Sequence, residues 1–254
     1  MIPKKIHYIW VGGKDKPKDV QKCIQTWKEH CPDYEIKEWN EENFDIHSHP
    51  FVEAAYKAKK WAFVSDYIRA YAIYHEGGIY MDTDVLVLSN LDELLKNKAF
   101  VGFEDPNIPF TAVFGAEPNH PFVKKIMDSY DKKLCKFDPE DANTYQVKKI
   151  LVEEYNCKLG NKEQNLNDGL HVYKSEILCK PSLKSKTIHV FSGSWIDGKR
   201  RWITDLDRSF RMKLTNHKII LLYIPFKHIV IILKWFGRLG IKIRTNLGGS
   251  KNEK

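Results

Sequence analysis

Paired cysteines are missing from this sequence of 254 residues. An odd set without a C-x-x-C pair argues against both a disulfide framework and a zinc site. We therefore expect reduced, mostly buried thiols at all five positions, which are Cys23, Cys31, Cys135, Cys157 and Cys179. Low-complexity segments and internal repeats are missing too. Because 43% of the residues are hydrophobic, the chain can form one substantial domain that buries an active site.

Long apolar runs are also missing. Charged residues interrupt every apolar stretch near the N-terminus, so the pattern shows no secretory signal. We therefore expect a cytoplasmic location, at the inner face of the plasma membrane. Residues 219–236 are rich in Ile, Leu, Trp and Phe, but Pro225, Lys227 and His228 break this run. A membrane-spanning helix needs about 20 mainly apolar residues, so this region is predicted to lie on a membrane rather than cross it.

The basic charge is gathered at one end of the chain. The net charge is +8, yet residues 199–244 alone carry twelve Lys or Arg and only two Asp. Apolar residues interleave with these cations, which favours an anionic membrane surface over a nucleic-acid partner. The alternative is an amphipathic helix packed on the domain. We expect a catalytic domain over residues 1–215 and a helical, membrane-contacting segment over residues 216–254.

The order of apolar patterns predicts an α/β fold. Strand, helix and strand follow one another in residues 5–39, which implies a parallel sheet with its ligand beyond the carboxyl ends of the strands. Residues 51–76 form a long helical stretch, with two helices meeting near Trp61 as an alternative, and Gly77-Gly78 stops it. The pattern predicts strands at residues 5–10, 34–39, 79–81, 85–88, 100–103, 111–114, 170–173 and 187–191, and helices at residues 17–30, 51–76, 120–134 and 144–155.

Two carboxylates, Asp82 and Asp84, interrupt the apolar stretch that runs from Ile79 to Leu88. Charged groups are costly in a core unless they are paired or bind a metal ion. In a regular strand both side chains would share one face, and at the end of a strand both can reach one small cation. Oxygen ligands favour Mn²⁺ or Mg²⁺. By itself, D-x-D also arises by chance in loops.

Upstream, Asp66 and Arg69 stand three residues apart and therefore face the same side of a helix. An ordinary intrahelical ion pair, worth about 0.2 to 0.5 kcal/mol, is the alternative explanation. The combination carries more weight than either pair alone. Residues 61–84 hold Trp61, Ser65, Asp66, Arg69, Gly77, Gly78, Tyr80, Asp82 and Asp84.

This block, W-x-x-x-S-D-x-x-R followed by G-G-x-Y-x-D-x-D, resembles the retaining glycosyltransferases with a DXD sugar-binding region. That group, glycosyltransferase family 32 and its relatives, includes outer-chain mannosyltransferases, capsular polysaccharide synthesis enzymes and the catalytic domains of clostridial glucosylating toxins. Residues 2–13 are similar to the opening of the family, and residues 189–195 to its H-x-x-x-x-S-W ending. The resemblance implies a GT-A type fold, with one Rossmann-like mixed sheet and a C-terminal helical appendage.

The resemblance also implies roles for matching residues. Asp66 and Arg69 would bind the donor sugar and its diphosphate, and Asp82 would touch the ribose, the sugar or a metal-bound water. Asp84 would be the more direct ligand of Mn²⁺ or Mg²⁺, with Asp82 beside it. The third ligand would come from the late motif, where we name His189 and leave Ser192 and Ser194 open. The remaining residues implied in nucleotide binding are Ile9, Trp10, Val11, Tyr80, Ser194 and Trp195.

Two residues in the N-terminal motif can be explained by structural roles alone. Core packing is the alternative for Trp10, and His7, in mid-strand, is expected to be a hydrogen-bonded structural histidine.

On the acceptor side, we expect residues 110–118, with Glu104 and Asp105 before them, to line the pocket. Asn143-Thr144-Tyr145 stands where family members often carry a Gly-Pro turn, which departs from the family pattern.

The function that the resemblance implies is transfer of a hexose, with galactose or glucose favoured, from a UDP-sugar to a saccharide acceptor. We expect a lipid-linked acceptor in bacterial surface polysaccharide synthesis. A GDP-mannose-dependent mannosyltransferase is the alternative. A haloacid-dehalogenase-type phosphatase fits less well, because Leu86 stands where D-x-D-x-[TV] needs Thr or Val and no later G-D-x-x-x-D follows. A non-catalytic module that binds lipid or nucleic acid would leave the two aspartates unexplained.

Overall fold

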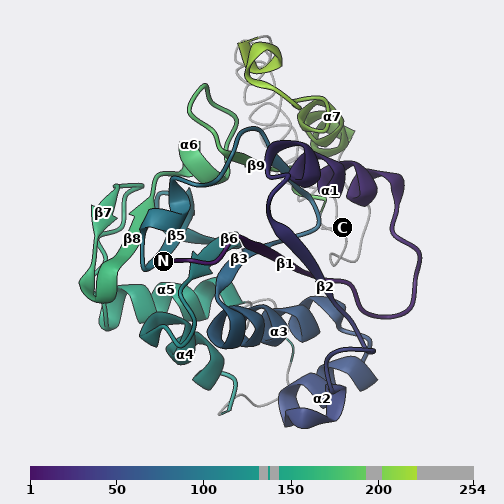
Figure 1. The fold of residues 1–254 in the computed structure, drawn as a ribbon, viewed down its shortest axis with the longest axis vertical. Coiled ribbons are helices and arrows are strands. Elements are labelled where there is room, and N and C mark those ends of the chain that lie inside the picture. The colour runs from purple at the N-terminus through teal and green to yellow at the C-terminus, as the bar shows by residue number, and fades with distance from the viewer. Residues whose placement is uncertain (132–136, 138–142, 193–201, 222–254) are drawn as a thin grey trace, which may run out of the picture.

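The computed structural model describes residues 1–131, 137, 143–192 and 202–221. Within them, seven strands form one mixed sheet in the order β2-β1-β3-β6-β5-β8-β7, and β4 pairs with β9 in a separate ribbon (Figure 1). The strands are β1 (Lys5–Ile9), β2 (Glu35–Trp39), β3 (Gly78–Met81), β4 (Val85–Val87), β5 (Ala99–Asp105), β6 (Ile108–Ala116), β7 (Gln164–Asn165), β8 (Leu170–Tyr173) and β9 (Thr187–His189).

Helices cover both faces of the sheet (Figure 1). On one side lie α2 to α5, and on the other lie α1, α6 and the β4-β9 ribbon, with α7 beyond α1. The helices are α1 (Lys18–His30), α2 (Pro50–Lys57), α3 (Trp61–Glu76), α4 (Pro121–Asp128), α5 (Asn143–Glu153), α6 (Ser175–Leu178) and α7 (Trp202–Arg211), with 3₁₀ turns at Ile46–Ser48, Leu94–Lys96 and Asn167–Gly169.

Alternation along the strands builds a separate core on each face of the sheet. Tyr80 of β3 packs into the core beneath α3, while its neighbours Ile79 and Met81 pack into the core beneath α1. In β1, Ile9 belongs to the first core and Tyr8 to the second. The predicted α/β fold with one mixed sheet is confirmed. The sheet is mixed, because β5 and β6 form a hairpin and hairpin strands are antiparallel.

Of the two placements considered for the aspartates, the structure has the one at the end of a strand. The apolar stretch around them is not one strand, since β3 belongs to the large sheet and β4 to the ribbon. Asp82-Thr83-Asp84 is the turn between them, where the Val85 N–H donates to the Asp82 carbonyl oxygen at 3.1 Å. The carboxylates therefore do not share a strand face. They approach each other because the chain changes direction there.

The helix boundaries differ in detail from the sequence pattern. The long stretch is two helices, α2 and α3, as in the alternative reading, with Lys59 at φ 56° between them. Helix α4 ends at Asp128, short of the expected residue 134, and residues 132–136 lie outside the described part of the chain. The two-residue strand β7 and the short helices α6 and α7 were not expected.

The junction of α3 and β3 depends on two glycines with positive φ. Gly77 has φ 66° and Gly78 has φ 105°, a region that disfavours side chains with a Cβ. A Cβ on Gly78 would lie 2.7 Å from the Lys5 carbonyl oxygen. This sharp reversal lets α3 lie against the sheet while β3 pairs directly with β1, so residues of both elements reach the same edge.

Two smaller expectations are confirmed. His7 is fully buried, accepts from the Trp39 Nε1–H at 2.9 Å and contacts the Gly77 carbonyl oxygen at 2.8 Å through Nε2. Because Nδ1 accepts, Nε2 carries the proton and donates to that carbonyl. The described cysteines are free and buried, namely Cys23, Cys31, Cys157 and Cys179, while Cys135 lies outside the described residues.

Little of the proposed membrane-contacting segment is described. Only residues 216–221 of the expected segment 216–254 fall within the structure's described range. Among the described helices, none combines the length and apolar character needed to cross a bilayer. The boundary near residue 215 stays a prediction.

Candidate active site

The candidate site forms at the edge of the sheet where β1 and β3 end. Asp82 follows β3 directly, and its backbone N–H donates to the Ala112 carbonyl oxygen of β6 at 2.8 Å. Trp10 follows β1 directly, and β1 pairs in parallel with β3, so Trp10 and Asp82 leave the sheet at the same edge. Ligands of open α/β sheets bind beyond the carboxyl ends of such strands.

Three side chains at this edge form a candidate metal centre. Asp82, Asp84 and His189 each offer a ligand atom, and these atoms all lie within 4.8 Å of one another. His189 arrives from the far end of the sequence because β9 pairs with β4 in a register that sets it opposite Val85. Two carboxylates and one imidazole fit a divalent cation, and this donor set suits Mn²⁺ better than Mg²⁺, which prefers oxygen ligands throughout.

Asp84 and His189 are held together in a nearly closed environment. His189 Nε2 lies 3.1 Å from Asp84 Oδ1, and the Ser192 backbone N–H donates to Asp84 Oδ2 at 2.7 Å. Burial alone would raise the pKa of Asp84, but the charge of His189 and both hydrogen bonds hold it well below its usual range. Burial would lower the pKa of His189, yet the Asp84 carboxylate raises it well above its usual value. The pair is therefore charged, and a metal ion would displace a proton from the imidazole.

A buried arginine organises the other half of the site. The Arg69 side chain is only 7% exposed and lies 3.0 Å from Asp66 Oδ1 and 3.4 Å from Asp82 Oδ1. Its guanidinium also stacks 4.5 Å from the centre of the Tyr80 ring. The expected intrahelical ion pair exists, but it is part of a network that reaches the DXD turn. Asp66, Arg69, Tyr80 and Asp82 therefore act on one another directly.

Tyr80 connects this network to the metal centre. Burial raises the pKa of the Tyr80 phenol well above 10, so the hydroxyl keeps its proton and donates to Asp82 Oδ1. The same oxygen faces Arg69. Asp82 is thus oriented by two donors on one oxygen, and its other oxygen is the one that can turn toward a ligand.

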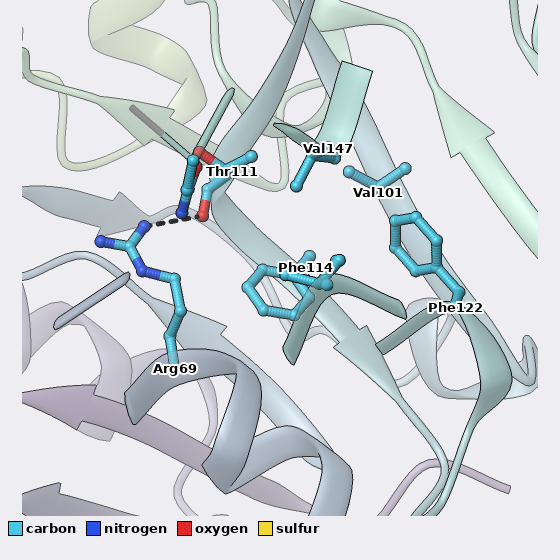
Figure 2. A pocket seen from close by; sticks show the side chains of 8 residues that line it. Arg69, Val101, Thr111, Phe114, Phe122 and Val147 are labelled. Carbon is cyan, nitrogen blue, oxygen red and sulfur yellow. Dashed lines mark hydrogen bonds between the residues drawn. The ribbon is translucent and has the colours of Figure 1, made fainter. Parts of the chain in front are cut away.

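The guanidinium of Arg69 is also fixed from the side of β6. Figure 2 shows Arg69 reaching from its helix toward Thr111, whose carbonyl oxygen accepts from Nη1 at 3.3 Å. The small cavity beyond is lined mainly by apolar side chains, with Phe114 and Phe122 among them, and its volume is about 10 Å³. That space holds at most one water molecule. Thr111 belongs to the segment 110–118 expected on the acceptor side, but its contact with Arg69 was not predicted, because a backbone carbonyl leaves no signal in the residue type.

The N-terminal motif is divided between core and surface. Ile9 is buried in the core beneath α3, so its side chain packs and only its backbone is left for a ligand. Trp10 is half-buried and donates from Nε1 to the Lys14 carbonyl oxygen at 2.6 Å. Val11 packs at the margin of the same core as Ile9. Gly12 lies against the Trp61 ring and donates from its backbone to Glu41 at 2.7 Å.

A cavity of about 140 Å³ joins the N-terminal motif to the DXD turn. Trp10, Thr83, Asp84 and Ser192 line it, together with Asp19 and Arg208 from α1 and α7. Sequence reasoning did not single out Asp19 or Arg208, which belong to no motif and meet only in the fold. The expected contributors Ser194 and Trp195 lie outside the described residues.

Comparison with known proteins agrees with this geometry. Residues 17–101 match a family described as the glycosyltransferase sugar-binding region containing a DXD motif. The matched segment holds both aspartates of the turn and the network around Arg69. Residues 17–101 of this chain are therefore similar to the sugar-binding region of the DXD glycosyltransferases. The resemblance seen in the sequence is confirmed.

Curated relatives are similar over about half of this chain. Inositol phosphoceramide mannosyltransferase 2 of Schizosaccharomyces pombe is 31% identical over 136 residues, covering 52% of this chain and 39% of that protein. Mannosyl phosphorylinositol ceramide synthase CSH1 of Saccharomyces cerevisiae is 32% identical over 142 residues, covering 51% and 35%. The match thus spans well under half the length of each of these relatives.

The solved structure of PaToxG glycosyltransferase is similar with a TM-score of 0.50 and 20% identity. The match covers 60% of this chain and 69% of that one. At this identity the likeness concerns the fold, and the GT-A type fold expected for this chain is confirmed.

Proposed function

We propose that this chain is a metal-dependent glycosyltransferase that moves a hexose from a nucleotide sugar to a saccharide or lipid-linked acceptor. The observation that carries the proposal is the approach of Asp82, Asp84 and His189 to within 4.8 Å beside the buried Arg69 network. Neither a phosphatase nor a binding module accounts for this arrangement together with the match over residues 17–101.

Sugar transfer requires stabilisation of the charge on the departing diphosphate. A divalent cation held by Asp84, Asp82 and His189 would supply that stabilisation as a Lewis acid. The protein's own contribution is to fix these ligands: Ser192 and His189 orient Asp84, while Tyr80 and Arg69 orient Asp82. Asp66, paired with Arg69, is the proposed contact to donor-sugar hydroxyls. We expect retention of anomeric configuration and assign no protein nucleophile.

For the donor we put GDP-mannose first and UDP-hexoses second. The sequence pattern favoured UDP-galactose or UDP-glucose, but both curated relatives described above carry names that denote mannosyl transfer. These names favour mannose as the transferred sugar, so GDP-mannose is the first donor to test. A role in bacterial surface polysaccharide synthesis remains a prediction.

For the acceptor we propose a lipid-linked or lipid-attached saccharide. The names of the curated relatives specify inositol phosphoceramide, a lipid, and the basic, apolar residues 216–254 suit an acceptor at a membrane surface. Contact with the inner face of the plasma membrane stays a prediction that vesicle binding can test. Deleting the residues after Thr215 should abolish that binding.

Glu104 of β5 is the residue that we propose to contact the acceptor. Because side chains alternate along a strand, Glu104 lies on the same face of β5 as Gly102. Gly102 contacts Leu178 of α6, so this face is the one toward α6 and the ribbon that carries His189. Burial raises the pKa of the Glu104 carboxyl, and among the described residues it has no hydrogen-bond or ion-pair partner. A half-buried carboxylate without a partner suits a hydrogen bond to an acceptor hydroxyl.

The proposal is tested by incubating the protein with a panel of nucleotide sugars and Mn²⁺ and measuring release of the nucleoside diphosphate. We expect hydrolysis of GDP-mannose or a UDP-hexose that EDTA abolishes. Asp84→Asn should lower the rate by about a hundredfold or more, while Asp33→Asn, an exposed carboxylate paired with Lys4, serves as the control. Phosphate release from a phosphomonoester with no turnover of any sugar donor would favour the phosphatase alternative instead.

A further inference from the structure

The cavity beside the DXD turn has a wall that belongs to none of the sequence motifs. Asp84, Thr83 and Trp10 line it, together with Arg208 of α7 and Met212, the residue that follows α7. Asp84 belongs to the candidate metal centre, so this cavity opens directly onto it. A ligand bound there contacts both the metal ligands and α7.

Arg208 is the single cation among the described residues that line this cavity. Its Nη2 atom lies 2.6 Å from Oδ2 of Asp19, which stands in the first turn of α1 and lines the same cavity. The two side chains are 31% and 52% exposed. Ion pairs between side chains this exposed contribute little to the stability of the fold. Either partner can therefore exchange the other for a stronger partner with little loss of free energy.

The other arginine of α7 has a different role. Arg211 donates from Nη1 to the His189 carbonyl oxygen at 3.0 Å and lies 5.2 Å from the centre of the Phe191 ring. It also pairs with Asp207 within α7 at 3.4 Å. These contacts of Arg211 hold α7 against the β4-β9 ribbon. Among the described residues, the Arg208 side chain hydrogen-bonds to one group, the solvent-exposed carboxylate of Asp19, and so stays available for a ligand.

We propose that Arg208 binds the diphosphate of the nucleotide donor, exchanging Asp19 for a phosphate oxygen when the donor enters. The proposal rests on the glycosyltransferase function proposed above. A guanidinium can bind phosphate through two parallel hydrogen bonds, whereas Arg208 donates to Asp19 through Nη2 alone. Arg208 then neutralises charge on the leaving group. It is a donor-binding residue that the family motifs do not include.

A purely structural role for the Asp19–Arg208 pair predicts a different behaviour. If the pair only fastened α7 to α1, loss of either partner would loosen α7 to the same extent. The Lys22 ammonium also joins the two helices, donating to the Met212 carbonyl oxygen at 2.6 Å, so α7 stays attached without the ion pair. The two roles therefore separate when each partner is removed in turn.

The test is calorimetric titration of the full chain with GDP and with UDP in the presence of Mn²⁺. Arg208→Gln should weaken binding of the nucleoside diphosphate by about tenfold, and Arg208→Lys by less, because lysine keeps the charge but not the paired donors. Asp19→Asn should bind equally or more tightly, since it releases Arg208 and removes a negative charge from the cavity. Lys213→Gln, an exposed cation just beyond α7, is the matched control and should bind as the wild type does.

The outcomes separate this inference from the function on which it rests. Equal binding by wild type and Arg208→Gln overturns the role of Arg208 but leaves the glycosyltransferase proposal standing. Parallel losses in Arg208→Gln and Asp19→Asn, with a matching drop in Tm, show that the pair is structural and also overturn it. If the wild type binds neither GDP nor UDP with Mn²⁺, the proposed function fails and this inference fails with it.

Discussion

The imidazole Nε2 of His189 lies 3.1 Å from Oδ1 of Asp84, although 105 positions separate the two residues in the chain. The contact exists because β4 and β9 pair in the ribbon, with Val85 opposite His189. The turn that carries the aspartates is thereby anchored to a late segment of the chain. The candidate metal centre therefore depends on the pairing of β4 with β9.

The first prediction concerns His189. In His189→Ala, the affinity for Mn²⁺ in the presence of a nucleoside diphosphate should fall by at least about tenfold, because one of three ligands is lost. Titration with Mn²⁺ followed by electron paramagnetic resonance measures this directly. His171→Ala is the matched control, since His171 also lies beside a carboxylate, Glu163, at 3.3 Å but belongs to strand β8. Equal Mn²⁺ affinity in wild type and His189→Ala would contradict the assignment.

The second prediction concerns the hydroxyl of Tyr80. Tyr80→Phe keeps the ring that stacks on Arg69 and removes only the hydrogen bond to Asp82. We expect kcat/KM for the donor to fall by about tenfold, a loss of about 1.4 kcal/mol in transition-state stabilisation. Steady-state kinetics gives the value. Unchanged kcat/KM would show that Asp82 needs no orientation by the phenol.

The third prediction concerns Glu104 and the acceptor. Glu104→Gln should raise KM for the acceptor while leaving the slow hydrolysis of the donor unchanged, because the Glu104 carboxyl is proposed to contact the acceptor and not the donor. Asp105→Asn, which alters the neighbouring exposed carboxylate that pairs with Lys180, is the control. Loss of donor hydrolysis in Glu104→Gln would instead tie this carboxyl to the donor site.

The fourth prediction is a pH dependence of stability from His7. Burial lowers the pKa of His7 to about 4, against 6.5 for the ordinary side chain. Between these pH values the unfolded chain binds a proton that the folded chain does not, so the free energy of unfolding falls as the pH drops from 6.5 to 4. The full effect is about 3 kcal/mol, and below about pH 4 this component becomes constant.

Urea unfolding across this pH range measures the effect. The variant His7→Gln keeps a donor and an acceptor toward Gly77 and Trp39 but does not titrate. Its stability should depend less steeply on pH than that of the wild type, even if it is lower throughout. Parallel curves for the two proteins would show that His7 titrates normally.

The sequence predicted the elements whose signals are local. Apolar alternation and the glycine stop at Gly77-Gly78 were enough to place β1, α1, β2, α3 and β3 nearly to the residue. The membership of β4 in a separate ribbon was not predicted, because sheet pairing depends on distant residues such as Thr187 and His189. The turn geometry of Asp82-Thr83-Asp84 follows from that pairing and was missed with it.

The same limit applies to the site. Asp66, Arg69, Tyr80, Asp82 and Asp84 were found because they belong to one short block, and His189 because it begins a second motif. Arg208 and Asp19 are 189 positions apart and meet only when α7 packs beside α1. Ile9 was assigned to the nucleotide pocket from the motif, yet strand alternation turns its side chain into the core beneath α3.

The central claim is that Asp84, with Asp82 and His189, holds a divalent cation that makes a nucleotide sugar reactive. Its most direct test is Mn²⁺-dependent release of the nucleoside diphosphate from GDP-mannose and UDP-hexoses by wild type and Asp84→Asn, with Tm measured for both. The account predicts release by the wild type from at least one donor, abolished by EDTA and reduced by about a hundredfold or more in a folded Asp84→Asn protein. Release at the same rate from both proteins, or from the wild type in EDTA, would contradict it.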